Sequence, residues 1–276
     1  GISSVAYFMS KIGLSWEDAK LASAHGRDCS LISLIRHHKK VFSIMGTTDG
    51  IASLAQKLVY YNMGEVLLYV GENLSYKDEK IFAAKASELA AYEGTALSVV
   101  CAWNPDAVSM CMTHGIEDAC FIRGKAPMTK SEVRTVSLAK LKLKENSVCY
   151  DIGAGTGSVA VEMALRAHQG VVYAIEKKDD AAELIEENRR KFAADNLILI
   201  KGTAPAAMCG LPSPTHAFLG GSSGNLREIL MLLVRKNKDV RIVINCIALE
   251  TVTETLQAIR DFAFEETEIV QLGVSR

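Results

Sequence analysis

The first hundred positions combine helical hydrophobic spacing with short apolar runs. Apolar residues three and four positions apart predict helices over residues 3–12 and 50–62, the second of them capped by Asp49. Apolar runs bounded by polar or glycine residues predict strands over residues 20–24, 41–45, 65–70 and 96–102. Residues 1–103 are therefore expected to form an α/β unit, and they contain no phosphate-binding loop of their own.

The second half alternates apolar runs with helical patterns. The runs predict strands over residues 148–150, 171–175, 196–201, 217–219 and 240–245, and a terminal hairpin is expected to begin with residues 268–272. Helical spacing predicts helices over residues 158–165, 179–192 and 250–262, and one more that begins at Asn225. A capping-box pattern from Thr129 to Glu132 predicts the start of a further helix. This alternation is typical of a doubly wound α/β domain.

The chain changes character between these halves. Residues 104–127 begin with Asn-Pro, continue with a short polar stretch and end in Arg-Gly-Lys-Ala-Pro. Such a segment is typical of a connection between domains. We therefore predict two domains, residues 1–122 and residues 123–276.

The strongest local pattern is the turn Asp-Ile-Gly-Ala-Gly-Thr-Gly at residues 151–157. It lies between a predicted strand and a predicted helix, where backbone N–H groups converge on a ligand. The dinucleotide fingerprint needs a glycine at the place of Ser158, so the spacing is not that of an NAD site. Glu176 ends the next predicted strand, where a carboxylate commonly binds ribose hydroxyls. The alternative is an ordinary turn and a solvated glutamate.

Together these features resemble the cofactor site of Rossmann-like S-adenosylmethionine (SAM) methyltransferases. The resemblance implies SAM as the cofactor, held by residues Thr129, Gly153, Ala154, Gly155, Thr156, Gly157, Glu176 and Ala204. For Thr129 the alternative is a helix cap, and for Ala204 an ordinary loop position. The glycine-rich residues 220–224 are expected to face the transferred methyl group, or else simply to cap a helix. They lack the [D/N]-P-P-[Y/F] motif of many amino-group methyltransferases, which argues against methylation of nitrogen.

Two family resemblances divide the chain in the same way. Residues 123–276 are similar to the carbon-15 methylating, decarboxylating (CbiT-type) enzymes of cobalamin biosynthesis, through stretches such as Pro-Met-Thr-Lys at 127–130 and Gly-Thr-Ala-Pro at 202–205. Residues 1–4, 14–18, 23–27 and 71–74 resemble the C-terminal lobe of the tetrapyrrole methylase fold, of the type (CbiE) that methylates carbon 5 of precorrin-6Y. The first lobe of that fold and the final strand of the second family are expected to be missing.

The resemblance implies methyl transfer to carbon 15 of a precorrin with loss of the ring C acetate carboxyl, and in the full-length protein also methylation of carbon 5. It further implies a homo-oligomer, in this family a tetramer. The sequence assigns no catalytic acid. We expect Arg123, Lys125, Lys130 and Arg134 to meet carboxylates of the tetrapyrrole. The alternatives are a SAM methyltransferase for another small molecule or RNA, and a first half that serves only for docking.

Composition narrows these alternatives. The 31 basic and 32 acidic residues nearly cancel, which disfavours a nucleic-acid partner. No apolar run is long enough for a membrane helix, and seven scattered cysteines without a C-x-x-C pair favour neither zinc nor disulfides. No metal site and a cytoplasmic location are therefore expected. Gly1 begins the sequence without an initiator methionine, so a piece of a longer protein is expected.

Overall fold

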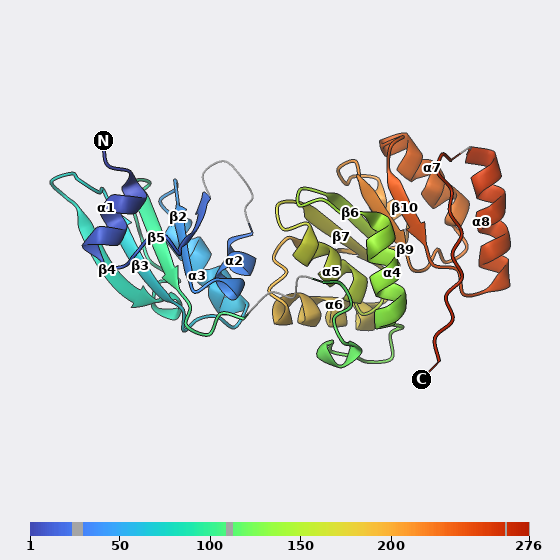
Figure 1. Cartoon of the computed structure of the whole chain (residues 1–276), viewed down its shortest axis with the longest axis horizontal. Helices are drawn as coiled ribbons and strands as arrows, with labels where there is room; N and C mark the ends of the chain where they lie inside the picture. The colour runs from blue at the N-terminus through green and yellow to red at the C-terminus, as the bar shows by residue number, and fades with distance from the viewer. Residues whose placement is uncertain (24–29, 109–112, 263, 276) are drawn as a thin grey trace. The chain divides into compact units, whose positions relative to one another are not determined.

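The structure is a computed structural model that describes residues 1–23, 30–108, 113–262 and 264–275. The chain divides into two compact units, Gly1–Met110 with Ala193–Asp195, and Cys111–Phe192 with Asn196–Arg276 (Figure 1). The domain boundary after residue 122 remains a prediction from sequence.

The first unit is built on one mixed sheet of five strands in the order β1-β2-β5-β3-β4. The strands are β1 Lys20–Ser23, β2 Lys40–Ile44, β3 Leu67–Glu72, β4 Lys80–Lys85 and β5 Ser98–Trp103. Only the β1–β2 pair is parallel among these, and the remaining pairs are antiparallel.

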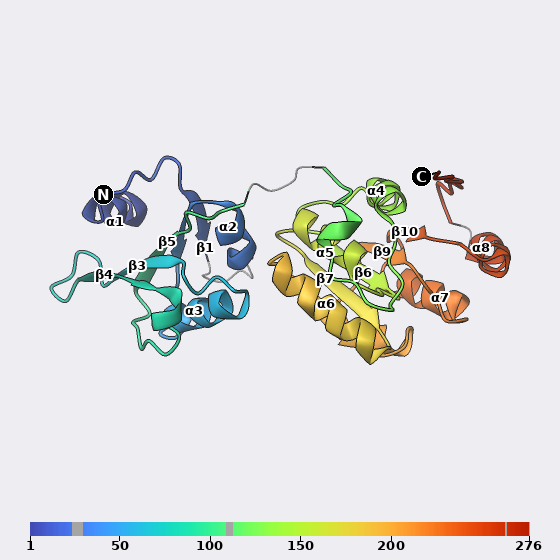
Figure 2. The ribbon, with the colours of Figure 1, turned by 90° about the horizontal axis from the view of Figure 1, so that it is seen from below.

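Helices cover both faces of this sheet. Alternate strand residues such as Leu68 and Val100 pack with α2 (Leu31–His37) and α3 (Gly50–Tyr60), whereas Phe42 and Cys101 face α1 (Ser4–Lys11). Figure 2 shows α1 and α3 on opposite sides of the strands. The two-residue period of a strand produces this division, because successive side chains point to opposite faces.

Most predicted elements of this unit are confirmed, and two were missed. Helix α2 has seven residues, too few for a clear helical period. Edge strand β4 has no fully buried residue and carries lysine at both ends. Asp49 precedes α3 as predicted, but its side chain makes no capping hydrogen bond. Residues 24–27 of the stretch that resembles the tetrapyrrole methylase lobe lie outside the described residues.

The second unit contains a fully parallel five-stranded sheet in the order β10-β9-β6-β7-β8. Its strands are β6 Val148–Ile152, β7 Val171–Glu176, β8 Leu197–Lys201, β9 His216–Leu219 and β10 Arg241–Ile244. The strand order reverses direction at β6, since the chain moves outward to β7 and β8 and then returns to β9. Ligands of open α/β sheets bind at such a switch point, outside the carboxyl ends of the strands.

Five helices accompany this sheet. They are α4 Ser131–Leu141, α5 Ser158–Arg166, α6 Asp179–Lys191, α7 Leu226–Lys236 and α8 Leu249–Phe262. Helix α5 contacts α4, α6 and the central strands, whereas α7 packs with α8. The face covered by α7 has an apolar core that includes Tyr150, Leu219 and Leu230. The predicted Rossmann-like α/β architecture is confirmed.

Two local predictions in this unit are wrong. Helix α4 begins at Ser131 after an N-cap at Lys130 that makes no side-chain bond, so Thr129 does not form the predicted capping box. Residues 268–272 are exposed and belong to no strand. A strand needs a hydrogen-bonded neighbour, and the described residues of this chain provide none for that segment.

Candidate functional site

The second unit has a pocket of about 240 Å³ at the carboxyl ends of its central strands. Its walls come from the loops after β6, β7, β8 and β9 and from the segment that leads to α4. The lining residues include Pro127, Gly153, Gly155, Glu176, Lys177, Lys178, Thr203, Ala204, Gly220, Gly221, Ser222 and Ser223. The pocket therefore lies at the switch point of the sheet.

The three glycines after β6 allow other segments to pack closely against this loop. Gly153, Gly155 and Gly157 have φ of 72°, 56° and 76°, a region that side chains rarely adopt. A Cβ on Gly153 would lie 2.7 Å from the Gly221 carbonyl oxygen, and one on Gly155 would collide with the Pro127 carbonyl. The space that a side chain would take is filled by backbone beside Gly153 and Gly155, and mainly by the Ile185 side chain beside Gly157.

The Glu176 carboxylate is nearly buried and held by three backbone N–H groups. It accepts hydrogen bonds from Gly155 at 2.9 Å, from Lys177 at 2.9 Å and from Lys178 at 3.0 Å. An ionised carboxylate has about four acceptor positions, so capacity for a further donor remains. The side chain is therefore fixed at the pocket wall in an orientation that can still bind a ligand.

The predicted cofactor residues divide into two groups. Gly153, Gly155, Glu176 and Ala204 line the pocket. The other four are Ala154, Thr156 and Gly157, which are buried in the loop behind it, and Thr129, whose carbonyl accepts a hydrogen bond from Arg134. Pro127, two residues before Thr129, takes the lining position on that side. The structure thus brings together the predicted residues that follow β6, β7 and β8. Thr129 is not among the residues that line the pocket.

The loop after β9 is a wall of the pocket and not only a helix cap. Gly221 and Ser222 line the pocket, and a Cβ added to Gly221 would meet no atom within 4 Å. The Asn225 amide at the start of α7 donates a hydrogen bond of 3.2 Å to the Ala204 carbonyl. This bond joins the loops after β8 and β9.

The basic residues expected to meet substrate are placed differently from the prediction. Arg134 is fully buried and paired with Glu162, so its predicted role as a substrate partner is wrong. Arg123, Lys125 and Lys130 are exposed and are not among the pocket-lining residues. Lys177 and Lys178 line the pocket instead. They directly follow Glu176 in the sequence, and this adjacency was the signal that could have identified them.

Lys177 reaches across the mouth of the pocket. Its Nζ lies 3.0 Å from the Ser223 hydroxyl, in the loop after β9. The cation thus bridges the ends of two strands that flank β6. An anionic group at the pocket mouth would meet this ammonium group.

Asp151 lies at the end of β6, behind the glycine loop. Burial raises the pKa of its carboxyl to about 7, the nearby Ala160 N–H lowers it and the Glu176 charge raises it. Burial likewise raises the pKa of the Cys149 thiol to about 12, which makes this cysteine an unreactive core residue. Neither side chain is among the residues that line the pocket.

Two further properties concern the described residues as a whole. They contain no group of three or more His, Cys, Asp or Glu side chains arranged to hold a metal ion. Among the same residues, no helix has both the length and the apolar character needed to span a membrane.

Comparison with known proteins places this site in a family. Residues 120–276 match the model of the precorrin methyltransferase domain. A probable cobalt-precorrin-6B C(15)-methyltransferase (decarboxylating) of Sulfurisphaera tokodaii is 40% identical over 165 residues, which are 59% of this chain and 85% of the relative. A precorrin-6Y C(5,15)-methyltransferase of Sinorhizobium is 30% identical over 223 residues, which are 79% of this chain and 54% of the relative.

Solved structures agree with this placement. The crystal structure of a precorrin-6Y C5,15-methyltransferase from Geobacter metallireducens is 37% identical and superposes with a TM-score of 0.53 over 55% of this chain and 82% of the other. The predicted family, the Rossmann-like methyltransferase fold and SAM as its cofactor are thereby confirmed. The chain belongs to the precorrin methyltransferase domain family.

Proposed function

We propose that the second unit transfers a methyl group from SAM to carbon 15 of a precorrin, with loss of the ring C acetate carboxyl as CO₂. The name of the Sulfurisphaera tokodaii relative states decarboxylating methylation at carbon 15 of a cobalt-precorrin, and that of the Sinorhizobium relative states it at carbons 5 and 15 of a precorrin. The observation that carries the proposal is the pocket at the switch point of the sheet, with Glu176 fixed in its wall and able to accept a further hydrogen bond.

The residues of the pocket fit an adenosyl group. Glu176 offers a charged acceptor for ribose hydroxyls, and Ala204 leaves room where a larger side chain would fill the cavity. We infer that Gly153 and Gly155 contribute wall surface, while Ala154, Thr156 and Gly157 support it from behind. Thr129 is proposed to act through the position of its backbone, since its carbonyl is bound to Arg134.

In this proposal, most of the acceleration of methyl transfer comes from the alignment of the SAM methyl group with the acceptor carbon. SAM, when bound, supplies an electrophilic methyl group, and the macrocycle supplies an enamine-like carbon that needs no strong base. Residues 220–223 of the loop after β9 line the pocket, and we propose that they position the acceptor. Holding two reactants in line removes an entropic cost that can exceed about 7 kcal/mol.

Substrate carboxylates are proposed to bind at the lysines of the pocket mouth. A precorrin carries several carboxylates, and Lys177 and Lys178 line the pocket. Lys177 is already directed toward Ser223 in the opposite loop. The Lys177 ammonium group can release the Ser223 hydroxyl and bind a substrate carboxylate instead. The new hydrogen bond would be stronger, because both of its partners are charged.

The first unit is proposed to belong to the carbon-5 part of a fused enzyme. The match to the Sinorhizobium relative has 223 residues, more than residues 111–276 contain, so it includes part of the first unit. This chain spans about half of that relative. Carbon-5 methylation is therefore proposed for the full-length protein only. A homo-oligomer, the absence of a nucleic-acid partner and a cytoplasmic location remain predictions.

A methyl-transfer assay tests the proposal. The purified chain would be incubated with SAM and a precorrin that lacks the carbon-15 methyl group, and the product would be analysed by mass spectrometry. We expect the gain of one methyl and the loss of one carboxyl, both dependent on SAM. Methylation of RNA under the same conditions, with an unchanged precorrin, would contradict the proposal and favour a nucleic-acid substrate.

A further inference from the structure

Arg134 of α4 is fully buried and donates hydrogen bonds to three different parts of the chain. Its Nε donates to the Glu162 carboxylate of α5 at 2.6 Å, and its Nη1 donates to the Thr129 carbonyl at 2.5 Å. Its Nη2 donates to the Ile116 carbonyl. One guanidinium thus connects two helices and two irregular segments.

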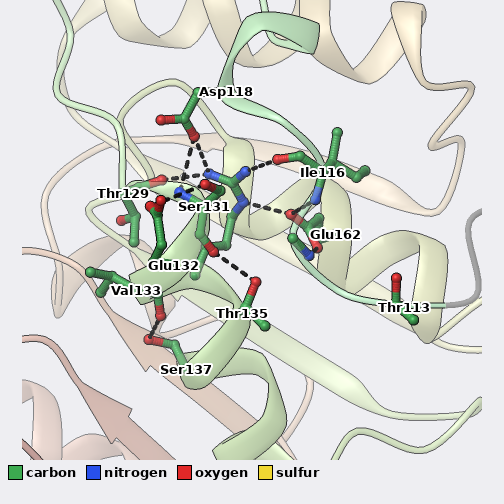
Figure 3. Close-up of polar contacts among 12 residues, drawn as sticks. Thr113, Ile116, Asp118, Thr129, Ser131, Glu132, Val133, Thr135, Ser137 and Glu162 are labelled. Carbon is green, nitrogen blue, oxygen red and sulfur yellow. Dashed lines mark hydrogen bonds and ion pairs between the residues drawn. The ribbon is translucent and has the colours of Figure 1, made fainter. Parts of the chain in front are cut away.

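Two carboxylates beside Arg134, those of Glu162 and Asp118, complete a cluster of three charged side chains that holds the irregular segment around Ile116. Glu162 accepts hydrogen bonds from the N–H groups of Gly115 at 2.8 Å and Ile116 at 3.1 Å. Asp118 accepts from the Ser131 N–H at 3.0 Å, at the first residue of α4. Figure 3 shows the carboxylates of Asp118 and Glu162 and the carbonyls of Thr129 and Ile116 joined by dashed lines to one guanidinium. The cluster therefore fixes residues 115–118 against both helices.

This cluster is connected to the cofactor pocket through residues 127–129. At one end of this short segment, the Thr129 carbonyl is held by Arg134. At the other end, the Pro127 carbonyl accepts a hydrogen bond of 3.3 Å from the Thr156 N–H in the glycine loop. Pro127 itself lines the pocket. The segment thus contributes Pro127 to the pocket wall and is attached at both ends.

Burial of these charges needs a reason, because an apolar pair of similar volume would often be as stable. The segment before α4 is irregular, so its carbonyl and N–H groups have no partners in a helix or sheet. Arg134 and Glu162 supply those partners, and a buried polar group without a partner is costly. The planar guanidinium can bind several acceptors at fixed angles, which a lysine cannot do.

We propose that Arg134 and Glu162 are positioning residues, which hold residues 127–129 in place as a wall of the SAM pocket. Neither side chain lines the pocket, so both act through the backbone between them and the cofactor. The proposal rests on the proposed function of this pocket.

The test uses the double variant Arg134→Met/Glu162→Gln. It removes both buried charges, and the glutamine oxygen still accepts a hydrogen bond from Gly115 or Ile116. We expect a cooperative thermal transition, an affinity for SAM about tenfold or more weaker by calorimetry, and faster hydrogen exchange over residues 115–129. A matched control is Arg241→Met, which removes a guanidinium bound to the Lys140 carbonyl at the other end of α4. The control should keep the wild-type affinity.

A second variant covers the case in which the double variant does not fold. Arg134→Lys keeps the charge beside Glu162 but loses the fork that reaches Thr129 and Ile116, and we expect the same loss of SAM affinity. Wild-type affinity in either folded variant would overturn the proposal, as would unchanged exchange over residues 115–129. If the wild-type chain itself does not bind SAM, the proposed function fails, and the exchange rates alone decide whether Arg134 holds the segment.

Discussion

The Gly155 N–H donates a hydrogen bond of 2.9 Å to the Glu176 carboxylate, and this bond joins the glycine loop after β6 to the end of β7. The Ile175 carbonyl reinforces the connection, since it accepts hydrogen bonds from the N–H groups of Gly153 and Ala154 at 3.0 and 3.2 Å. The glycine loop and the Glu176 side chain therefore hold each other in position. We expect changes in either residue to affect both the shape of the loop and the binding of a ligand.

Gly155 and Gly221 should respond differently to substitution by alanine. Gly155→Ala places a side chain at φ 56° and against the Pro127 carbonyl, so we expect a loss of roughly 1–3 kcal/mol of stability and a lower melting temperature. Gly221→Ala meets no atom within 4 Å and should keep the wild-type melting temperature. Calorimetric scans of both variants check this. Equal melting temperatures would contradict the packing described here for the loop.

Asp151 should make the stability of the second unit depend on pH. Its folded-state pKa is raised from 3.8 to about 7, so between these values the folded protein holds a proton that the unfolded chain has released. The free energy of unfolding should therefore fall as the pH rises through this window. Histidines with lowered pKa, among them His114 and His216, act in the opposite direction. The contribution of Asp151 must therefore be isolated by difference.

Urea unfolding of the wild type and of Asp151→Asn at several pH values provides that difference. The asparagine side chain does not titrate, so the variant should gain stability relative to the wild type as the pH rises toward 7. A difference that stays constant across the window would show that the Asp151 carboxyl titrates as it does in an unfolded chain.

Substitution of Lys177 should weaken the binding of substrate and leave the binding of SAM unchanged. For Lys177→Ala we expect the KM for the precorrin to rise about fivefold, as for the loss of roughly 1 kcal/mol from one exposed charged pair. The dissociation constant of SAM should be unchanged. Lys201→Ala is a matched control, because Lys201 is an exposed lysine on the neighbouring strand that pairs with Asp179. A weaker affinity for SAM with an unchanged KM would place Lys177 at the cofactor instead.

Periodicity and motif spacing were sufficient to predict the second unit and the centre of its pocket. The strands are short apolar runs and the helices other than α4 have a clear apolar face, so most elements could be identified locally. Glu176 could be predicted as a cofactor residue because the apolar run before it shows where the strand ends. The same holds for the glycines at 153 and 155, which line the pocket with it.

Features that depend on contacts between distant residues could not be predicted. Arg134 has the sequence context of an exposed helical arginine, and only the folded chain brings Glu162 and Ile116 to it. The role of the glycines in admitting neighbouring backbone depends in the same way on Pro127 and Gly221. Edge strand β4 was missed because its short apolar run, residues 81–84, shows no alternation with polar residues and none of its residues is fully buried.

Calorimetric titration of SAM into the wild-type chain and into Glu176→Gln tests most directly whether this pocket is the cofactor site. We expect one site in the wild type, and a loss of roughly 1.5–3 kcal/mol in the variant, about ten- to a hundredfold in affinity, because the acceptor is charged. Glu183→Gln, an exposed glutamate on α6, should bind as the wild type does. Absence of binding, or equal affinity of the wild type and Glu176→Gln, would contradict the assignment.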